Sequence, residues 1–275
     1  MRSTFFNVVF VSSTAVLAFT GYVASFVLPA TAMRNWLYAW GTLGQWGVRN
    51  ILNGTVEVRG REHLPTDQPY VIAAKHQSEL DVLMMVALFP DMTTVAMKTL
   101  EKTPFFGRII RRLGFIMVDL AIPDNRTKQV IDGARVAFDE GRPIVIYPEG
   151  TLMALGAKER YRGGIWHIYN ELGAKVTPVA MSVGVIWPRR DKVKYMNQTG
   201  AFEFLPPIEL GLDQPTFMAR LEETIEANTM RLIEEHASGD ILDAARDRHA
   251  RGVGNEDIPW QAEQNRSRKE LTRNK

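Results

Sequence analysis

Short apolar runs alternate with helical stretches along most of the chain. Seven runs have the length and apolar character of strands: residues 55–60, 69–75, 93–98, 114–120, 143–148, 175–181 and 201–205. Four longer stretches have helical periodicity: 78–89, 125–140, 163–173 and about 215–237. Ser78 is placed to cap the first of these helices, and Gly141 to close the second. This alternation predicts an α/β fold with a largely parallel central sheet flanked by helices.

An uncharged run opens the chain. No Asp, Glu, Lys, Arg or His occurs from Ser3 to Met33, and a helix needs ~20 mostly apolar residues to span a bilayer. Only Arg2 precedes the run, whereas many basic residues follow it, so the positive-inside rule places the rest of the chain in the cytoplasm. A cleaved signal peptide is the alternative, because residues 30–32 read Ala-Thr-Ala, although the run exceeds a typical ~7–15-residue signal core.

The next segment, Arg34 to Leu52, carries three tryptophans at roughly helical spacing, Trp36, Trp40 and Trp46. Tryptophan favours the membrane–water interface, but the same spacing suits a helix that packs on a soluble core. For residues 1–52 we therefore expect a membrane helix followed by an interfacial helix, with core packing as an equal alternative for the second.

The length of 275 residues allows one sizeable α/β domain after this pair, which we place at 53–240. Residues 241–275 are expected to form a polar, basic, disordered tail, a candidate for contact with anionic lipid. A net charge of +2 gives no reason to expect a nucleic-acid partner. The lack of cysteine excludes thiolate nucleophiles, disulfides and cysteine-built zinc sites.

The first candidate for chemistry is the stretch AKHQSELD, residues 74–81. An apolar strand ends there, His76 follows in the turn, and Asp81 lies in the first turn of the next helix. A carboxylate at this spacing can hold one imidazole nitrogen and favour the cation that forms when the other nitrogen takes a proton. A histidine beside a carboxylate is more often structural, but the end of a parallel strand is where open α/β sheets place their sites.

A second polar turn follows the strand at 143–148. Glu149, Gly150 and Thr151 offer a carboxylate, a closely approachable backbone and a hydroxyl for a polar headgroup, although Gly150 alone suits any turn. This turn and His76 share one site only if their two strands are neighbours. Basic residues also gather between Lys98 and Arg112, with Arg126 nearby, as a phosphate site or lipid-facing surface would require. A solvated helix face is the alternative.

Several familiar chemistries have no candidate in the sequence. There is no G-x-S-x-G elbow for an acyl-serine hydrolase, no Walker loop and no dinucleotide-binding G-x-G-x-x-G. The other histidines lack ligand spacing, so we expect no metal site and no bound cofactor.

Four blocks together resemble the membrane-bound glycerophospholipid acyltransferases, the family that includes lysophosphatidic acid acyltransferase. The resemblance covers about residues 50 to 210, with all blocks in order and in register. The family's His-x4-Asp, G-x-I-x-V-D-R, F-P-E-G-T-R and V-x-P-V motifs are matched by His76 and Asp81; Gly114, Ile116, Val118 and Asp119; Tyr147 to Thr151; and Val176, Pro178 and Val179.

The resemblance implies an α/β domain docked on the cytoplasmic (inner) membrane, facing the cytoplasm. It also implies direct acyl transfer from acyl-CoA or acyl-carrier protein to a lysolipid, with His76 as base and Asp81 orienting it. Lys98 matches a lysine that holds the acceptor phosphate, Glu149, Gly150 and Thr151 match the acceptor-binding turn, and Pro178 lies in a block assigned to the acyl-donor pocket.

Two positions depart from the family pattern. Leucine replaces the arginines that usually end the second and third blocks, at Leu120 and Leu152. Those arginines are phosphate partners in the family, so Arg126 or the cluster from Arg108 to Arg112 becomes the substitute. With the four blocks present and such a substitute available, we expect an enzyme that makes phosphatidate from 1-acylglycerol 3-phosphate. The alternatives are another lysolipid acceptor, such as lyso-ornithine lipid, or a catalytically silent lipid-binding protein.

Overall fold

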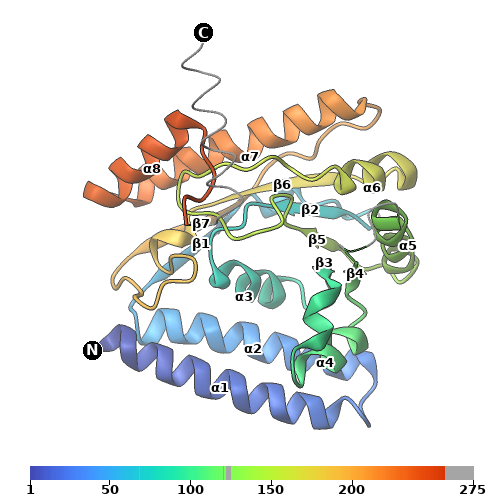
Figure 1. Ribbon diagram of the computed structural model, residues 1–275, viewed down its shortest axis with the longest axis horizontal. Helices are drawn as coiled ribbons and strands as arrows, with labels where there is room; N and C mark the ends of the chain where they lie inside the picture. Colours follow the sequence, from blue (N-terminus) through green and yellow to red (C-terminus); the bar gives the residue numbers. More distant parts are fainter. Residues whose placement is uncertain (68, 120, 122–124, 258–275) are drawn as a thin grey trace.

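A seven-stranded sheet forms the centre of the molecule, in the order β1-β7-β6-β2-β5-β3-β4 (Figure 1). The computed structural model describes residues 1–67, 69–119, 121 and 125–257. All seven predicted strands are present: β1 (Thr55–Arg59), β2 (Val71–Ala74), β3 (Thr93–Met97), β4 (Ile116–Val118), β5 (Ile144–Ile146), β6 (Val176–Met181) and β7 (Thr199–Phe204).

The sheet is largely parallel, as predicted, and two strands run the other way. β6, β2, β5, β3 and β4 are mutually parallel, whereas β7 is antiparallel to β6 and parallel to β1. A parallel connection needs a long crossover, usually a helix. The segment between β6 and β7 contains only a short 3-10 helix, Val183–Val185, so the chain turns back beside β6.

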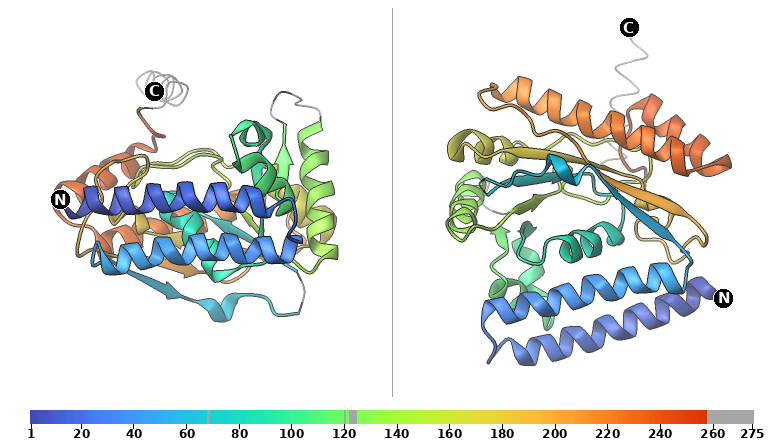
Figure 2. Two further views of the ribbon diagram at one scale, coloured as in Figure 1. Left: turned by 90° about the horizontal axis from the view of Figure 1, so that it is seen from below. Right: turned by 180° about the vertical axis from the view of Figure 1, so that it is seen from behind.

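The four predicted helices cover the two faces of the sheet: α3 (Glu79–Leu88), α5 (Arg126–Asp139), α6 (Gly164–Leu172) and α7 (Gln214–His236). The Ser78 hydroxyl accepts a hydrogen bond from the Leu80 amide, and Gly141 has φ +70°, so both predicted helix ends are confirmed. One apolar core lies between the sheet and α3, and the other lies between the sheet and α5, α6 and α7 (Figures 1 and 2).

The N-terminal residues form two helices side by side, α1 (Arg2–Ala24) and α2 (Ala30–Asn50), beneath α3 (Figure 2). Three glycines bring α2 close to its neighbours. A Cβ added to Gly41 would lie 2.6 Å from the carbonyl oxygen of Leu83, and one on Gly47 would lie 2.8 Å from the Phe6 ring. Gly44 meets Leu83 in the same way. The helical pair is therefore packed against the α/β domain and is part of its core.

The tryptophans of α2 fit both alternatives for this segment, an interfacial helix and a helix packed within the protein. The Trp36 indole N–H donates to the Leu17 carbonyl at 3.2 Å, and that of Trp40 to the Thr14 hydroxyl at 3.0 Å, so these two hold α1 against α2. Trp46 is 51% exposed. Within the described ranges, α1 is the one helix long and apolar enough to cross a membrane.

The prediction of a disordered tail from residue 241 is wrong for residues 241–251, because Gly239–Arg251 form a helix, α8. Leu242 and Ala245 give this polar stretch a narrow apolar side that packs on Met230 and Ile233 of α7. These two apolar residues, with an ion pair between Arg246 and Glu234 of α7, hold a helix that shows no clear apolar stripe in the sequence. The rest of the predicted tail, from residue 258, lies outside the described residues.

Candidate active site

The end of β2 and the start of α3 build a histidine–aspartate pair. His76 lies between them, and its Nδ1 is 3.0 Å from each carboxylate oxygen of Asp81. Asp81 is fully buried and also accepts the backbone N–H groups of Gln77 and Ser78, at 2.9 and 3.0 Å. Because Asp81 closes the capping box of α3, its carboxylate is fixed before any substrate binds.

The pair leaves Nε2 of His76 available. A carboxylate at Nδ1 selects the tautomer in which Nδ1 carries the hydrogen and Nε2 carries the lone pair. Burial opposes the charged imidazolium, but the Asp81 carboxylate outweighs it and raises the pKa of His76. The arrangement can therefore take a proton from a hydroxyl and stabilise the cation that results.

Replacing Asp81 with asparagine should slow catalysis and move the acidic limb of the pH–rate profile to lower pH. Asparagine keeps an oxygen for the backbone N–H groups, so α3 stays capped. The carboxylate that raises the pKa of His76 is gone, so the imidazole becomes neutral at a lower pH than in the wild type. The measurement is kcat/KM against pH for both proteins, and an unshifted limb contradicts this role for Asp81.

The turn after β5 lies against His76, as the prediction of a shared site required. β5 is the direct neighbour of β2. The Tyr147 ring stacks on the His76 ring with centroids 4.1 Å apart, and the Met153 N–H donates to the His76 carbonyl at 2.6 Å. The residues between Tyr147 and Met153, which include Gly150 and Thr151, therefore form one wall of the site.

A buried ionic cluster that the sequence did not predict lies behind this wall. The Lys75 ammonium is fully buried, 3.1 Å from a carboxylate oxygen of Glu149 and 2.6 Å from one of Glu226 on α7. The Tyr161 hydroxyl donates to the same Glu226 oxygen at 2.9 Å. The available signal was a lysine that ends an otherwise apolar buried strand, VIAAK.

Glu149 belongs to this cluster and faces the interior. Its side chain is fully buried, and burial raises its pKa to about 7 although Lys75 pulls in the other direction. Both carboxylate oxygens of Glu149 are buried, so this side chain cannot make the predicted contact with a headgroup. Of the three predicted turn residues, Gly150 is exposed and Thr151 half-buried.

Three of the predicted phosphate-binding cations already have partners within the protein. Lys98 Nζ lies 3.3 Å from Asp119 Oδ2. Arg108 and Arg112 belong to α4 (Phe106–Arg112), and both bind the turn between α1 and α2, through the Ser25 hydroxyl and the Leu28 carbonyl. Neither of these arginines is free to replace a phosphate ligand.

The remaining predicted site residues have simple placements. Arg126 is the first residue of α5 and is half-buried. Pro178 is buried in β6, opposite Ala73 of β2, and its carbonyl accepts the Leu205 N–H at 2.9 Å. Its assignment to a donor pocket stays a prediction. Leu152 is half-buried, and Leu120 lies outside the described residues.

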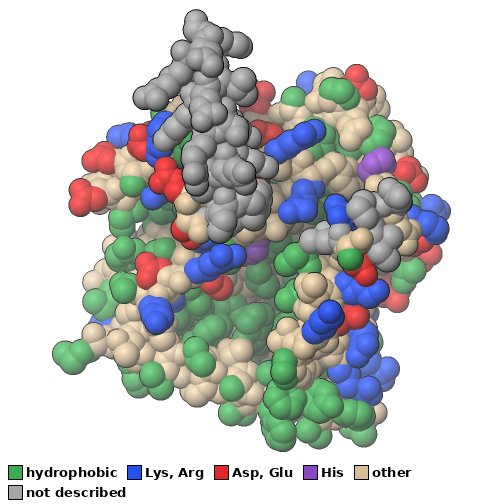
Figure 3. Space-filling model, in the orientation of Figure 1, with side chains coloured by type: hydrophobic (Ala, Val, Ile, Leu, Met, Phe, Trp, Pro, Cys, Tyr) green, Lys and Arg blue, Asp and Glu red, His purple; other side chains and the backbone are tan. Residues whose placement is uncertain are grey.

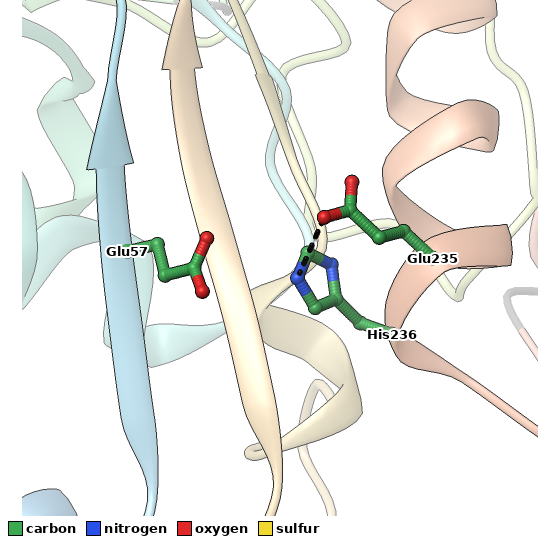
Figure 4. A group of neighbouring side chains, drawn as sticks. All are labelled: Glu57, Glu235 and His236. Carbon is green, nitrogen blue, oxygen red and sulfur yellow. Dashed lines mark ion pairs between the residues drawn. The ribbon is translucent and has the colours of Figure 1, made fainter.

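One group of metal-type ligands lies away from this site, between β1 and the end of α7. Figure 4 shows Glu57, Glu235 and His236. The Arg59 guanidinium makes ion pairs with both carboxylates, and Nδ1 of His236 is 3.0 Å from the Ser182 hydroxyl. Because Arg59 already supplies the positive charge, we assign this cluster to fastening α7 to the sheet.

Comparison with known proteins places this site in a family. Residues 55–182 match the family model described as Acyltransferase, and they include β2, α3 and the turn after β5. The 1-acyl-sn-glycerol-3-phosphate acyltransferase of Pseudomonas aeruginosa is 26% identical over 230 residues, which cover 82% of this chain and 88% of that protein. The mouse 1-acyl-sn-glycerol-3-phosphate acyltransferase alpha is 29% identical over 128 residues, 46% of this chain and 45% of the mouse protein.

A solved structure has the same fold. The crystal structure of the 1-acyl-sn-glycerophosphate (LPA) acyltransferase PlsC from Thermotoga maritima matches with a TM-score of 0.68 and 18% identity. The match covers 87% of this chain and all of that one. Residues 55–182, which carry the His76–Asp81 pair, thus form a domain of the acyltransferase family.

Proposed function

We propose that the protein transfers a fatty acyl group from acyl-CoA or acyl-carrier protein to the sn-2 hydroxyl of 1-acylglycerol 3-phosphate, which gives phosphatidate. The observation that carries the proposal is the His76–Asp81 pair, with Nε2 of His76 left unbonded among the described residues. The names of the bacterial and mouse relatives support the choice of acceptor.

The chemistry follows from this one base. His76 Nε2 takes the proton from the acceptor hydroxyl while the oxygen attacks the thioester carbonyl carbon, and the imidazolium is held by Asp81. The tetrahedral intermediate then collapses, the carbon–sulfur bond breaks, and the leaving thiolate takes the proton back from His76. The ester forms and free thiol leaves, with no acyl group attached to the protein.

A panel of substrates tests the proposal. The purified protein is incubated with acyl-CoA or acyl-carrier protein and with lysophosphatidate, lysophosphatidylcholine or lyso-ornithine lipid. We expect lysophosphatidate to be the best acceptor. Leu152, where the family has arginine, is the observation that favours another acceptor. Preference for lyso-ornithine lipid would change the acceptor but keep the reaction, whereas no product with any pair would leave only a lipid-binding role.

We further propose that α1 and α2 dock the domain on the cytoplasmic membrane, with the site facing the cytoplasm. α1 presents an exposed apolar stripe: Phe5, Val8, Val11, Val16, Phe19 and Val23. Figure 3 shows hydrophobic side chains at the lower edge of the molecule, where α1 lies in Figure 1. The other side of α1 is held by the domain, because Phe6 is buried and packs edge-on against Trp187. These contacts favour a helix that lies in one leaflet over a spanning or cleaved segment.

Charges placed on the stripe should release the protein from vesicles. Phe19→Asp and Val16→Asp each remove an apolar side chain whose burial is worth ~1.5–3 kcal/mol, so either should weaken partitioning by at least ~10-fold. Leu210→Asp is the matched control, since Leu210 is similarly exposed and precedes α7, the helix that lies across the sheet from α1 (Figure 1). Co-sedimentation with anionic vesicles measures the effect. Equal binding by all four proteins would exclude docking through α1.

A further inference from the structure

A phosphomonoester acceptor requires a cation close to His76. The phosphate of 1-acylglycerol 3-phosphate is attached to the carbon next to the one that bears the reacting hydroxyl. It carries between one and two negative charges at neutral pH and is best bound by charge-assisted hydrogen bonds. Leu152 offers none, Lys75 is buried between two carboxylates, and Arg108 and Arg112 hold the α1–α2 turn.

Arg162 lies in the connection between β5 and α6, just before α6, and contacts the turn that forms the wall beside His76. Its backbone N–H donates to the Pro148 carbonyl at 2.9 Å. Its guanidinium lies so close to Gly150 that a Cβ added there would be 2.2 Å from Arg162 Nε and 2.8 Å from Cζ. Gly150 also has φ +68°, a conformation that favours glycine. The glycine thus leaves room for the arginine above the turn.

The Arg162 side chain is exposed, and within the described part of the chain it has no ion pair or side-chain hydrogen bond. Lys98, by comparison, is paired with Asp119. An unpaired guanidinium beside an active-site turn presents a planar fork of N–H donors that fits a phosphate in bidentate fashion.

We propose that Arg162 binds the phosphate of the acceptor and so selects lysophosphatidate over uncharged lysolipids. The assignment rests on the proposed function. In the family an arginine at the position of Leu152 supplies this positive charge. Here Arg162 supplies it from ten residues further along the same connection between β5 and α6. A phosphate held over Gly150 would keep the neighbouring hydroxyl beside the His76 ring, because Tyr147 and Met153 of the same turn contact His76 directly.

The test compares a charged and an uncharged acceptor with the full-length protein. For Arg162→Gln, we expect kcat/KM with 1-oleoylglycerol 3-phosphate to fall ~10–150-fold, mainly through KM, as for one lost charge-assisted contact. With 1-oleoylglycerol, and for the acyl donor, the constants should stay as in the wild type. Arg162→Lys should recover part of the loss, because it restores charge without the fork.

Arg160→Gln is the matched control, an exposed arginine two positions away on the same loop, and it should behave as wild type. Thermal unfolding of each variant separates binding from folding. If Arg162→Gln lowers the rate with both acceptors equally, or with neither, the assignment of Arg162 is wrong while the acyltransferase proposal stands. If the wild type does not acylate 1-oleoylglycerol 3-phosphate at all, both fall together.

Discussion

Replacing His76 with alanine should lower the rate of acyl transfer by at least ~10²–10⁴-fold, the usual contribution of a general base. In the described residues around the turn, no other side chain combines an available lone pair with a carboxylate partner. The loss should appear in kcat with either acyl donor, because the proton comes from the acceptor. Initial rates with wild-type and variant protein, measured in the same detergent, give the ratio.

The fold of this variant should survive. Asp81 loses one partner but keeps the N–H groups of Gln77 and Ser78, so α3 remains capped. His167→Ala is the matched control, because His167 also has a carboxylate nearby, Glu171 at 3.5 Å, but lies on α6. Its rate should equal that of the wild type. A His76→Ala rate above a few per cent of wild type would mean that another group takes the proton.

Replacing Lys75 with methionine should destabilise the protein by about 3–5 kcal/mol, the cost of breaking a buried ion pair from one side. The ammonium is the positive partner of both Glu149 and Glu226, and without it two buried carboxylates face each other. The deficit should shrink as the pH falls. Burial raises the pKa of Glu149 to about 7, so this carboxylate takes up a proton in the folded state as the pH falls below 7. A protonated Glu149 carries no charge that needs Lys75 as a partner, and the loss of Lys75 then costs less stability.

Chemical denaturation at pH 8 and pH 5.5 measures both effects. Lys175→Met is the matched control, since Lys175 pairs with Asp67 on the surface and exposed pairs contribute little. Adding Glu226→Gln to Lys75→Met should restore part of the stability, because one of the two unpaired charges is removed. A Lys75→Met protein as stable as the control variant would show that the cluster is not an ionic one.

The sequence was sufficient for the elements whose periodicity is strong. All seven strands and four helices were predicted, because buried strands give unbroken apolar runs and amphipathic helices give a regular stripe. The His76–Asp81 contact was also predictable, since both residues lie within one strand–turn–helix unit. Helix α8 was missed because only Leu242 and Ala245 mark its packed side.

Contacts between distant parts of the chain were not predictable in the same way. Lys75 and Glu226 are separated by 151 positions, and no local pattern joins them. The inward orientation of Glu149 follows from that pairing, so the motif alone suggested a headgroup ligand. Arg162 lies against Gly150 because of the path of the irregular segment between β5 and α6, and no periodic pattern in the sequence predicts that path. The site was therefore identified by its local pair, and its surroundings by the structure.

The most direct measurement is product analysis with an isotopically labelled acyl donor. Wild-type protein in vesicles with labelled acyl-CoA and 1-oleoylglycerol 3-phosphate should yield phosphatidate with the label at sn-2 and one free thiol per ester formed. His76→Ala should yield neither above background. Labelled free fatty acid without phosphatidate, or label covalently attached to the protein, would contradict direct acyl transfer by His76.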